Sequence, residues 1–125
     1  MTQPTLRRYS ETHQWISPID NDVFYVGITD FAQQQLGDVM FMDLPKVGTQ
    51  VKQNESCATV ESVKSASDVY APVSGTIIEI NNQLADKLES INQDPYGSWL
   101  FKIQCSNMAD FEQLLTEEAY QKLIG

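Results

Sequence analysis

The sequence predicts a mainly β fold, with one short internal helix and helices at the C-terminal end. Short runs rich in β-branched and aromatic residues fill most of the chain, separated by proline, glycine and Asp/Asn turns. Only after Cys105 does the spacing of apolar residues become helical. With 125 residues, of which 42% are hydrophobic and 20% charged, the chain can bury one core and is expected to form one domain.

The first elements are predicted to be a β-hairpin and a short helix. VFYVGI, Val23 to Ile28, has the composition of a strand and follows HQWISPI after the turn residues DND, Asp20 to Asp22. In TDFAQQQLGD, Thr29 is a typical N-cap and Gly37 a typical terminator. One short helix is therefore expected between Thr29 and Gly37.

Five further strands and a helical tail are predicted downstream. The strand sequences are VMFMDL, SCATVESV, SDVYAPV, GTIIEI and WLFKIQ, separated by Pro45, Gly48, Pro72, Gly75 and the DPYG turn. After Cys105, DFEQLLTEEAYQKLIG has helical spacing with a new start at Thr116. We expect a C-terminal helical appendage at about residues 107–125.

The segment ESVKSASDVYAPVSG presents one lysine at a predicted strand reversal. Lys64 is expected at the tip of a hairpin of about residues 56–75, with small neighbours that let an enzyme enclose the amine or let an attached group swing. From geometry alone, an ordinary solvated lysine is the simpler interpretation. A Schiff-base lysine is disfavoured, because that chemistry needs a buried amine or cationic neighbours, and Lys64 lies near Glu61 and Asp68.

Charge and cysteine usage restrict the function classes. The net charge of −9, from 17 acidic and 8 basic residues, disfavours nucleic acid and anionic membranes as partners and leaves basic protein surfaces. No apolar run approaches the ~18 residues of a membrane span, and no secretory signal is present, which favours an intracellular protein. Cys57 and Cys105 lack CxxC spacing and are expected to be reduced, buried thiols.

No catalytic or metal-binding set is evident. The chain has one histidine, His13, so a His-rich metal site is excluded, and a Cys/His nucleophile would need a cysteine beside it. There is no glycine-rich phosphate loop. Trp15 and Trp99 are expected to fill strand cores. The residues alone therefore give no support for metal, Cys/His or nucleotide chemistry.

The same segments resemble the H-protein family of the glycine cleavage system, whose members are lipoyl carriers. HQW, VGITDFAQQQLGD, ESVKSASDVYAPVSG, and DPYG followed by WLFKI occur in the family's order between Tyr9 and Ile124. The lysine-bearing segment is the most specific match. The resemblance implies a lipoyl/biotinyl-type flattened β-barrel, a barrel-sandwich hybrid, and a single lipoyl-carrier domain over residues 1–125.

The resemblance implies that Lys64 carries lipoate in amide linkage. It also implies that Glu61 and Gly75 help lipoylating enzymes to recognise the hairpin. Biotin carriers share the fold but have methionines on both sides of the lysine, whereas Val63 and Ser65 occupy those places here. Lipoate is therefore expected rather than biotin.

A cleft for the loaded arm is also implied. Its residues in this sequence would be Thr12, His13, Gln14, Ile28 and Asp68. The family usually has glutamate at the position of Gln14, and a neutral amide makes a weaker hydrogen bond to an ammonium group than a carboxylate does. Gln14 therefore offers weaker shielding, for which Asp68 could compensate.

The resemblance implies that the protein is a shuttle and is not itself an enzyme. Glycine decarboxylase (P protein) would load an aminomethyl group onto lipoyl-Lys64, aminomethyltransferase (T protein) would remove the carbon, and dihydrolipoamide dehydrogenase (L protein) would reoxidise the dithiol. A lipoyl-lysine arm reaches about 14 Å from its Cα atom, far enough to enter several active sites. The expected location is the bacterial cytoplasm, or the mitochondrial matrix for a eukaryotic source.

Two alternatives remain open. The first is a lipoate-relay protein of the same fold, which would donate lipoyl groups from Lys64 to other complexes; the departure at Gln14 is its basis. The second is an interaction domain or small enzyme that shares only the fold, which would leave Lys64 without lipoate.

Overall fold

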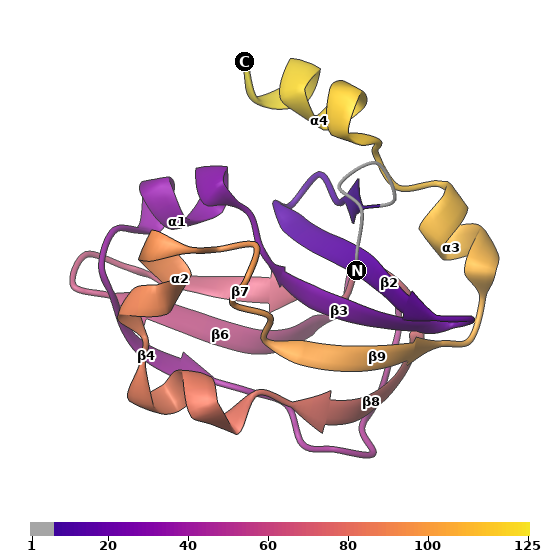
Figure 1. The fold of residues 1–125 in the computed structure, drawn as a ribbon, viewed down its shortest axis with the longest axis horizontal. Helices are drawn as coiled ribbons and strands as arrows, with labels where there is room; N and C mark the ends of the chain where they lie inside the picture. Colours follow the sequence, from indigo (N-terminus) through magenta and orange to yellow (C-terminus); the bar gives the residue numbers. More distant parts are fainter. Residues whose placement is uncertain (1–6) are drawn as a thin grey trace.

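Two antiparallel β-sheets form the body of the protein in the computed structural model, which describes residues 7–125 (Figure 1). The six-stranded sheet has the order β1 (Arg8–Tyr9), β2 (Gln14–Asp20), β3 (Val23–Ile28), β9 (Phe101–Cys105), β8 (Gly75–Ile80) and β5 (Gln50–Val51). The three-stranded sheet has the order β4 (Val39–Asp43), β6 (Ser56–Ser62) and β7 (Ala66–Tyr70). The predicted mainly β fold is confirmed.

Short helices lie at the periphery of the sheets. They are α1 (Asp30–Leu36), the 3₁₀ helix η2 (Asn82–Asp86), α2 (Glu89–Gln93), α3 (Met108–Glu112) and α4 (Glu117–Ile124). The predicted cap Thr29 accepts a hydrogen bond from the N–H group of Ala32, and Thr116, the predicted start of the last helix, accepts one from Ala119, each at 3.2 Å. The predicted termination of α1 at Gly37 is also confirmed, at a φ of 87°.

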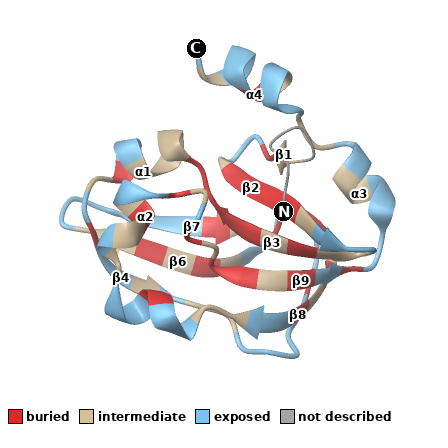
Figure 2. Cartoon of the chain, in the orientation of Figure 1, coloured by how far each residue is buried: buried red, intermediate tan, exposed pale blue. Residues whose placement is uncertain are grey.

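A hydrophobic core fills the space between the two sheets (Figure 2). The larger sheet contributes Ile16, Phe24, Val26, Ile77 and Ile103, and the smaller sheet contributes Ala58, Val60 and Val69. Complete burial of such a side chain is worth about 1.5–3 kcal/mol, so these contacts hold the two layers together. Because β6 and β7 both contribute to this core, the hairpin that they form has an anchored base.

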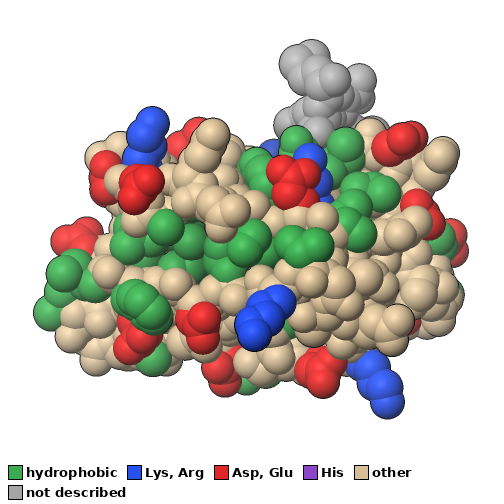
Figure 3. All heavy atoms as spheres, turned by 90° about the horizontal axis from the view of Figure 1, so that it is seen from below, with side chains coloured by type: hydrophobic (Ala, Val, Ile, Leu, Met, Phe, Trp, Pro, Cys, Tyr) green, Lys and Arg blue, Asp and Glu red, His purple; other side chains and the backbone are tan. Residues whose placement is uncertain are grey.

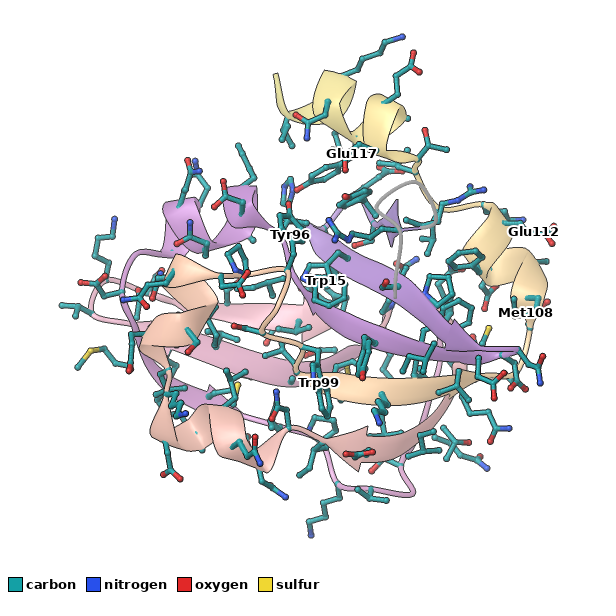
Figure 4. The ribbon with its side chains drawn as sticks, in the orientation of Figure 1. Trp15, Tyr96, Trp99, Met108, Glu112 and Glu117 are labelled. Carbon is teal, nitrogen blue, oxygen red and sulfur yellow. The ribbon has the colours of Figure 1, made fainter. Side chains whose placement is uncertain are left out.

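A second, aromatic cluster attaches α4 to the larger sheet. Tyr120 of α4 stacks on Tyr9 of β1, with ring centroids 4.6 Å apart and planes 7° from parallel. Trp15 belongs to the same cluster and donates its indole N–H to the carbonyl oxygen of Pro95 at 3.0 Å. Figure 4 shows Trp15 and Tyr96 side by side; their ring centroids are 6.2 Å apart.

Two tryptophan predictions have different outcomes. Trp15 is buried in β2, as expected. Trp99 precedes β9 instead of lying in it, is only half-buried, and packs against Tyr25 with ring centroids 5.1 Å apart. The glycine opposite Trp15 is required by space, because a Cβ atom at Gly27 would lie 2.6 Å from the Trp15 ring.

Both cysteines are free thiols. Cys105 is buried, whereas Cys57 is only half-buried, so the expectation of two buried thiols holds for Cys105 alone. Burial raises the pKa of Cys57 to about 12, which keeps this thiol protonated at neutral pH.

Within residues 7–125, none of the helices is both long and apolar enough to cross a bilayer.

Candidate functional site

The turn between β6 and β7 holds Lys64 at the tip of a hairpin. Its backbone closes through a hydrogen bond of 2.7 Å from the N–H of Ser62 to the carbonyl oxygen of Ser65. The Ser62 hydroxyl oxygen also accepts the N–H groups of Lys64, at 3.2 Å, and Ser65, at 3.1 Å. Lys64 is exposed, so the turn fixes the backbone of the lysine and leaves its side chain in solvent.

The Lys64 side chain lies beside the end of α1. A Cβ atom built on Gly37 would lie 3.2 Å from Cε and 3.7 Å from Nζ of Lys64. Gly37 therefore serves two purposes: it adopts the positive φ that ends the helix, and it leaves room for the lysine stem. This proximity of α1 to the hairpin tip could not be inferred from local sequence.

The two predicted recognition residues lie at different places. Glu61 is three residues before Lys64 and pairs with Ala66 on β7. Gly75 begins β8, beyond the opposite end of the hairpin from the turn, and pairs with Cys105. A Cβ atom at Gly75 would lie 2.1 Å from the carbonyl oxygen of Gln104, so the sheet itself requires a glycine there. The structure does not bring Gly75 next to Lys64.

An open hollow of about 390 Å³ lies beside the hairpin tip. It is lined by Thr12, His13, Phe31, Ala32, Gln35, Leu36, Ser65, Ala66 and Ser67. Two residues of the expected arm cleft, Thr12 and His13, are among them. The second wall comes from one face of α1, which was not predicted from the sequence to line a cleft. The only local signal for this role of α1 is the set of apolar residues on one side of the predicted helix.

The other three residues of the expected cleft lie elsewhere. Gln14 is buried, and its side-chain oxygen accepts hydrogen bonds from the hydroxyls of Ser10, at 2.8 Å, and Thr12. Ile28 is part of the core between the sheets. Asp68 is exposed and is not among the residues that line the hollow.

His13 connects the hollow to the C-terminal helix. Its Nδ1 atom is 2.8 Å from the hydroxyl of Tyr120, and that hydroxyl is 2.7 Å from the hydroxyl of Thr29. The imidazole ring also packs on Phe31, with centroids 4.7 Å apart. Burial lowers the pKa of His13 and raises that of Tyr120 to about 12, so both groups are neutral at pH 7.

Neither thiol is paired with this histidine. Cys57 donates to the carbonyl oxygen of Val69 at 3.4 Å, and Cys105 donates to that of Asn107 at 3.2 Å. The site therefore places an exposed amine, on a turn with a fixed backbone, beside an open hollow. It can hold a covalently attached group and partly enclose it.

Comparisons with known proteins agree over nearly the whole chain. The sequence model of the family described as "Glycine cleavage H-protein" matches residues 7–125. A glycine cleavage system H protein of Thermotoga maritima is 52% identical over 118 residues, which are 94% of each chain. One of Acinetobacter baumannii is 47% identical over 122 residues, covering 97% of this chain and 98% of the relative. The crystal structure of a glycine cleavage system H protein from Mycobacterium marinum superposes with a TM-score of 0.87 at 40% identity, covering 98% of this chain and 99% of that one.

Proposed function

Because the chain belongs to the glycine cleavage H-protein family, we propose that it is a lipoyl carrier of the glycine cleavage system, with lipoate in amide linkage to Lys64. The observation that carries the assignment is the exposed lysine in a turn whose backbone is fixed by Ser62. Such a turn offers a modifying enzyme a single, reproducible shape. The protein acts as a carrier rather than a catalyst.

The residues around Lys64 fit a long attached group. The amine is exposed, the neighbouring Gly37 leaves space for the stem, and the hollow of about 390 Å³ lies within reach of an arm of about 14 Å. Lipoate, once bound, supplies a reducible disulfide and a sulfur atom that can carry the aminomethyl group of glycine. The acyl amide removes the charge of the lysine, which suits a group that moves between water and sheltered sites.

The chain itself would position and shield the arm. Ser62 holds the turn, and Phe31 and Leu36 give the hollow an apolar wall that limits contact with water. The neutral imidazole of His13 provides a polar edge without a charge. Gln14 would support this edge indirectly, through its hydrogen bonds to Ser10 and Thr12, rather than by touching the arm.

Four kinds of partner follow from this role. The arm would visit glycine decarboxylase (P protein), aminomethyltransferase (T protein) and dihydrolipoamide dehydrogenase (L protein), after a lipoylating enzyme has acted on Lys64. Glu61 would contribute to recognition by that enzyme. Gly75 would contribute indirectly, by fixing the position of the base of the hairpin. The carrier domain would span residues 1–125, and the bacterial relatives support the cytoplasm as its location.

The lipoate-relay alternative is favoured by one observation. Gln14 makes its hydrogen bonds within its own segment, so the carboxylate that the family usually places there has no direct substitute at the hollow. A relay protein would need the lipoyl arm but not the shielding of a loaded amine.

Lipoylation of Lys64 is the first test. The purified chain is incubated with a lipoate ligase, ATP and lipoate, and the site is mapped by mass spectrometry of peptides. We expect one lipoyl group on Lys64, none on the Lys64→Arg variant, and normal modification of a control variant at another exposed lysine, Lys87→Arg. A folded wild-type chain that acquires no lipoyl group would refute the assignment.

Turnover separates the two carrier roles. The lipoylated protein is supplied to glycine decarboxylase with glycine, and release of CO₂ is measured. Release of CO₂ that depends on Lys64 supports the glycine cleavage role. A lipoylated protein that supports no glycine decarboxylation, but donates its lipoyl group to another acceptor domain, would support the relay role instead.

A further inference from the structure

Three large hydrophobic side chains stand exposed beside the Lys64 turn. Val63 is 77% exposed, Met40 is 62% exposed and Phe41 is 55% exposed. Val63 directly precedes the lysine, whereas Met40 and Phe41 belong to β4. We refer to these three residues as the tip patch. A single exposed apolar residue is ordinary on a protein surface, but a group of them next to one reactive side chain indicates a contact surface.

Strand pairing brings the members of the tip patch together. At the start of β4, Val39 pairs with Ser62, and Phe41 pairs with Glu61. A register shift between Val39 and Phe41 lets two consecutive residues, Met40 and Phe41, both face solvent. Neighbouring strands are about 4.8 Å apart, so these two side chains lie alongside the last residues of β6.

Acidic side chains of β4, β6 and β7 lie beside the tip patch. Glu61 lies across from Phe41, and two residues further along the strands Asp43, Thr59 and Asp68 form a row. Figure 3 shows the molecule from below the view of Figure 1, where hydrophobic side chains gather in a band with acidic and basic side chains beside it. A partner with an apolar centre and a basic rim would be complementary to such a surface.

The lengths of the bare lysine side chain and of the lipoyl arm identify which partner must cover the tip patch. The lysine Nζ lies about 6 Å from its Cα atom in an extended side chain, whereas a lipoyl arm reaches about 14 Å. An enzyme that uses the loaded arm can therefore stay clear of the hairpin surface. An enzyme that forms a bond to Nζ has to bring its active site to the tip itself, and then β4 comes within its footprint.

We propose that Met40, Phe41 and Val63 form the docking surface for the enzyme that attaches lipoate to Lys64. The inference rests on the proposed function, because it requires that Lys64 is lipoylated. It extends recognition from the hairpin to β4, a strand outside the lysine-bearing segment. The enzyme contributes an apolar surface over the tip patch, with cationic side chains opposite Glu61 and Asp43.

The test measures the kinetics of lipoylation of the full chain. Phe41→Ser and Met40→Ser are compared with the wild type as acceptors for a lipoate ligase with ATP and lipoate. We expect the KM for the acceptor to rise about five- to tenfold with kcat nearly unchanged, because docking is weakened and the reacting amine is intact. Phe41→Leu, which keeps an apolar side chain, should retain most of the wild-type KM.

A matched control removes a similar exposed residue elsewhere. Val47 is 59% exposed but lies beyond the other end of β4, so Val47→Ser should leave the KM unchanged. Unfolding midpoints of all variants are measured in parallel. If Phe41→Ser and Phe41→Leu both lower the midpoint, the change in KM arises from a loss of folding and the proposal is overturned.

The remaining outcomes separate the two proposals. Failure of the wild type to accept lipoate refutes the proposed function, and the docking surface with it. A wild type that is lipoylated at Lys64, with unchanged KM for Phe41→Ser and Met40→Ser, overturns the docking surface alone. The docking surface is also overturned if the variants have a normal KM in lipoylation but, once lipoylated, a raised KM with glycine decarboxylase. That result would assign the tip patch to glycine decarboxylase.

Discussion

The hairpin tip lines the hollow, whereas the aromatic cluster under α4 is connected to it through His13, and the two regions are held in opposite ways. The tip is an exposed turn closed by hydrogen bonds among Ser62, Lys64 and Ser65. The aromatic cluster is buried and joins the two ends of the described chain, with Tyr9 bonded to the backbone of Leu115 at 2.8 Å in both directions and stacked on Tyr120.

The aromatic cluster therefore governs the stability of the fold, whereas the tip governs how Lys64 is offered to a partner. Removing a buried aromatic ring affects the free energy of unfolding, because a cavity replaces close contacts. Changing an exposed turn affects chiefly how a side chain is offered to a partner, because little surface is buried there. Substitutions in the two regions should therefore change different measurements.

The largest effect is expected from Tyr120→Ala. The side chain is 1% exposed, and its removal should lower the free energy of unfolding by about 3 kcal/mol. Urea denaturation measures this loss, and Tyr120→Phe, which removes only the hydroxyl, should cost about 1 kcal/mol. The rate of lipoylation of folded Tyr120→Ala should equal that of the wild type. A large loss of that rate would break the separation of the two regions.

A pair of glycines tests the contact between α1 and the lysine. Gly37 and Gly48 both have positive φ, and placing alanine in such sparsely populated backbone regions costs roughly 1–3 kcal/mol. Only at Gly37 would the added Cβ meet Lys64, whereas nothing lies within 4 Å at Gly48. Gly37→Ala and Gly48→Ala should thus lose similar stability, and only the first should alter the lipoylation rate. Equal lipoylation rates would show that Gly37 does not position the lysine.

Ser62→Ala should reveal how far the turn depends on one hydroxyl. The substitution removes the acceptor of two N–H groups, an effect of about 1 kcal/mol by analogy with helix caps. We expect a severalfold lower kcat/KM for lipoylation and little change in the unfolding midpoint. Ser65→Ala is the control, because Ser65 enters the turn through its backbone N–H and carbonyl. The same loss in both variants would contradict a specific role for Ser62.

The smallest effect concerns pH and His13. Burial lowers the pKa of this imidazole below its ordinary value of 6.5, so the folded state disfavours protonation. Its contribution to stability is complete above pH 6.5 and is lost as the pH falls through 6.5 toward the lower value of the folded state. His13→Asn, which tolerates the positive φ, should flatten the dependence of unfolding free energy on pH below pH 6.5. An unchanged dependence would place the titration elsewhere.

The sequence predicted those features that depend on neighbours in the chain. Thr29 was predicted as a cap and Thr116 as a helix start, and the side chain of each accepts the N–H group three residues ahead. η2 and α2 were missed, and their first turns have no side-chain cap, so they carry no local signature. The turn at Lys64 was predictable for the same reason as the caps.

The hollow depends on contacts between distant segments. His13 meets Tyr120, more than a hundred residues later in the chain, and the end of α1 meets Lys64 across the fold. Such pairs leave no periodicity in the sequence, which explains why only Thr12 and His13 of the expected cleft line the hollow. The positions of Gln14 and Asp68 likewise depend on which way each strand faces.

The two tryptophans give the protein a pair of built-in optical reporters. Trp15 is buried in the aromatic cluster beside Tyr96, whereas Trp99 is half-exposed against Tyr25 and Lys102. Emission from the first should lie at shorter wavelength and resist quenching by iodide. In a Trp99→Phe background, the remaining fluorescence would follow the docking of α4 directly, without an added label and in the same samples used for denaturation.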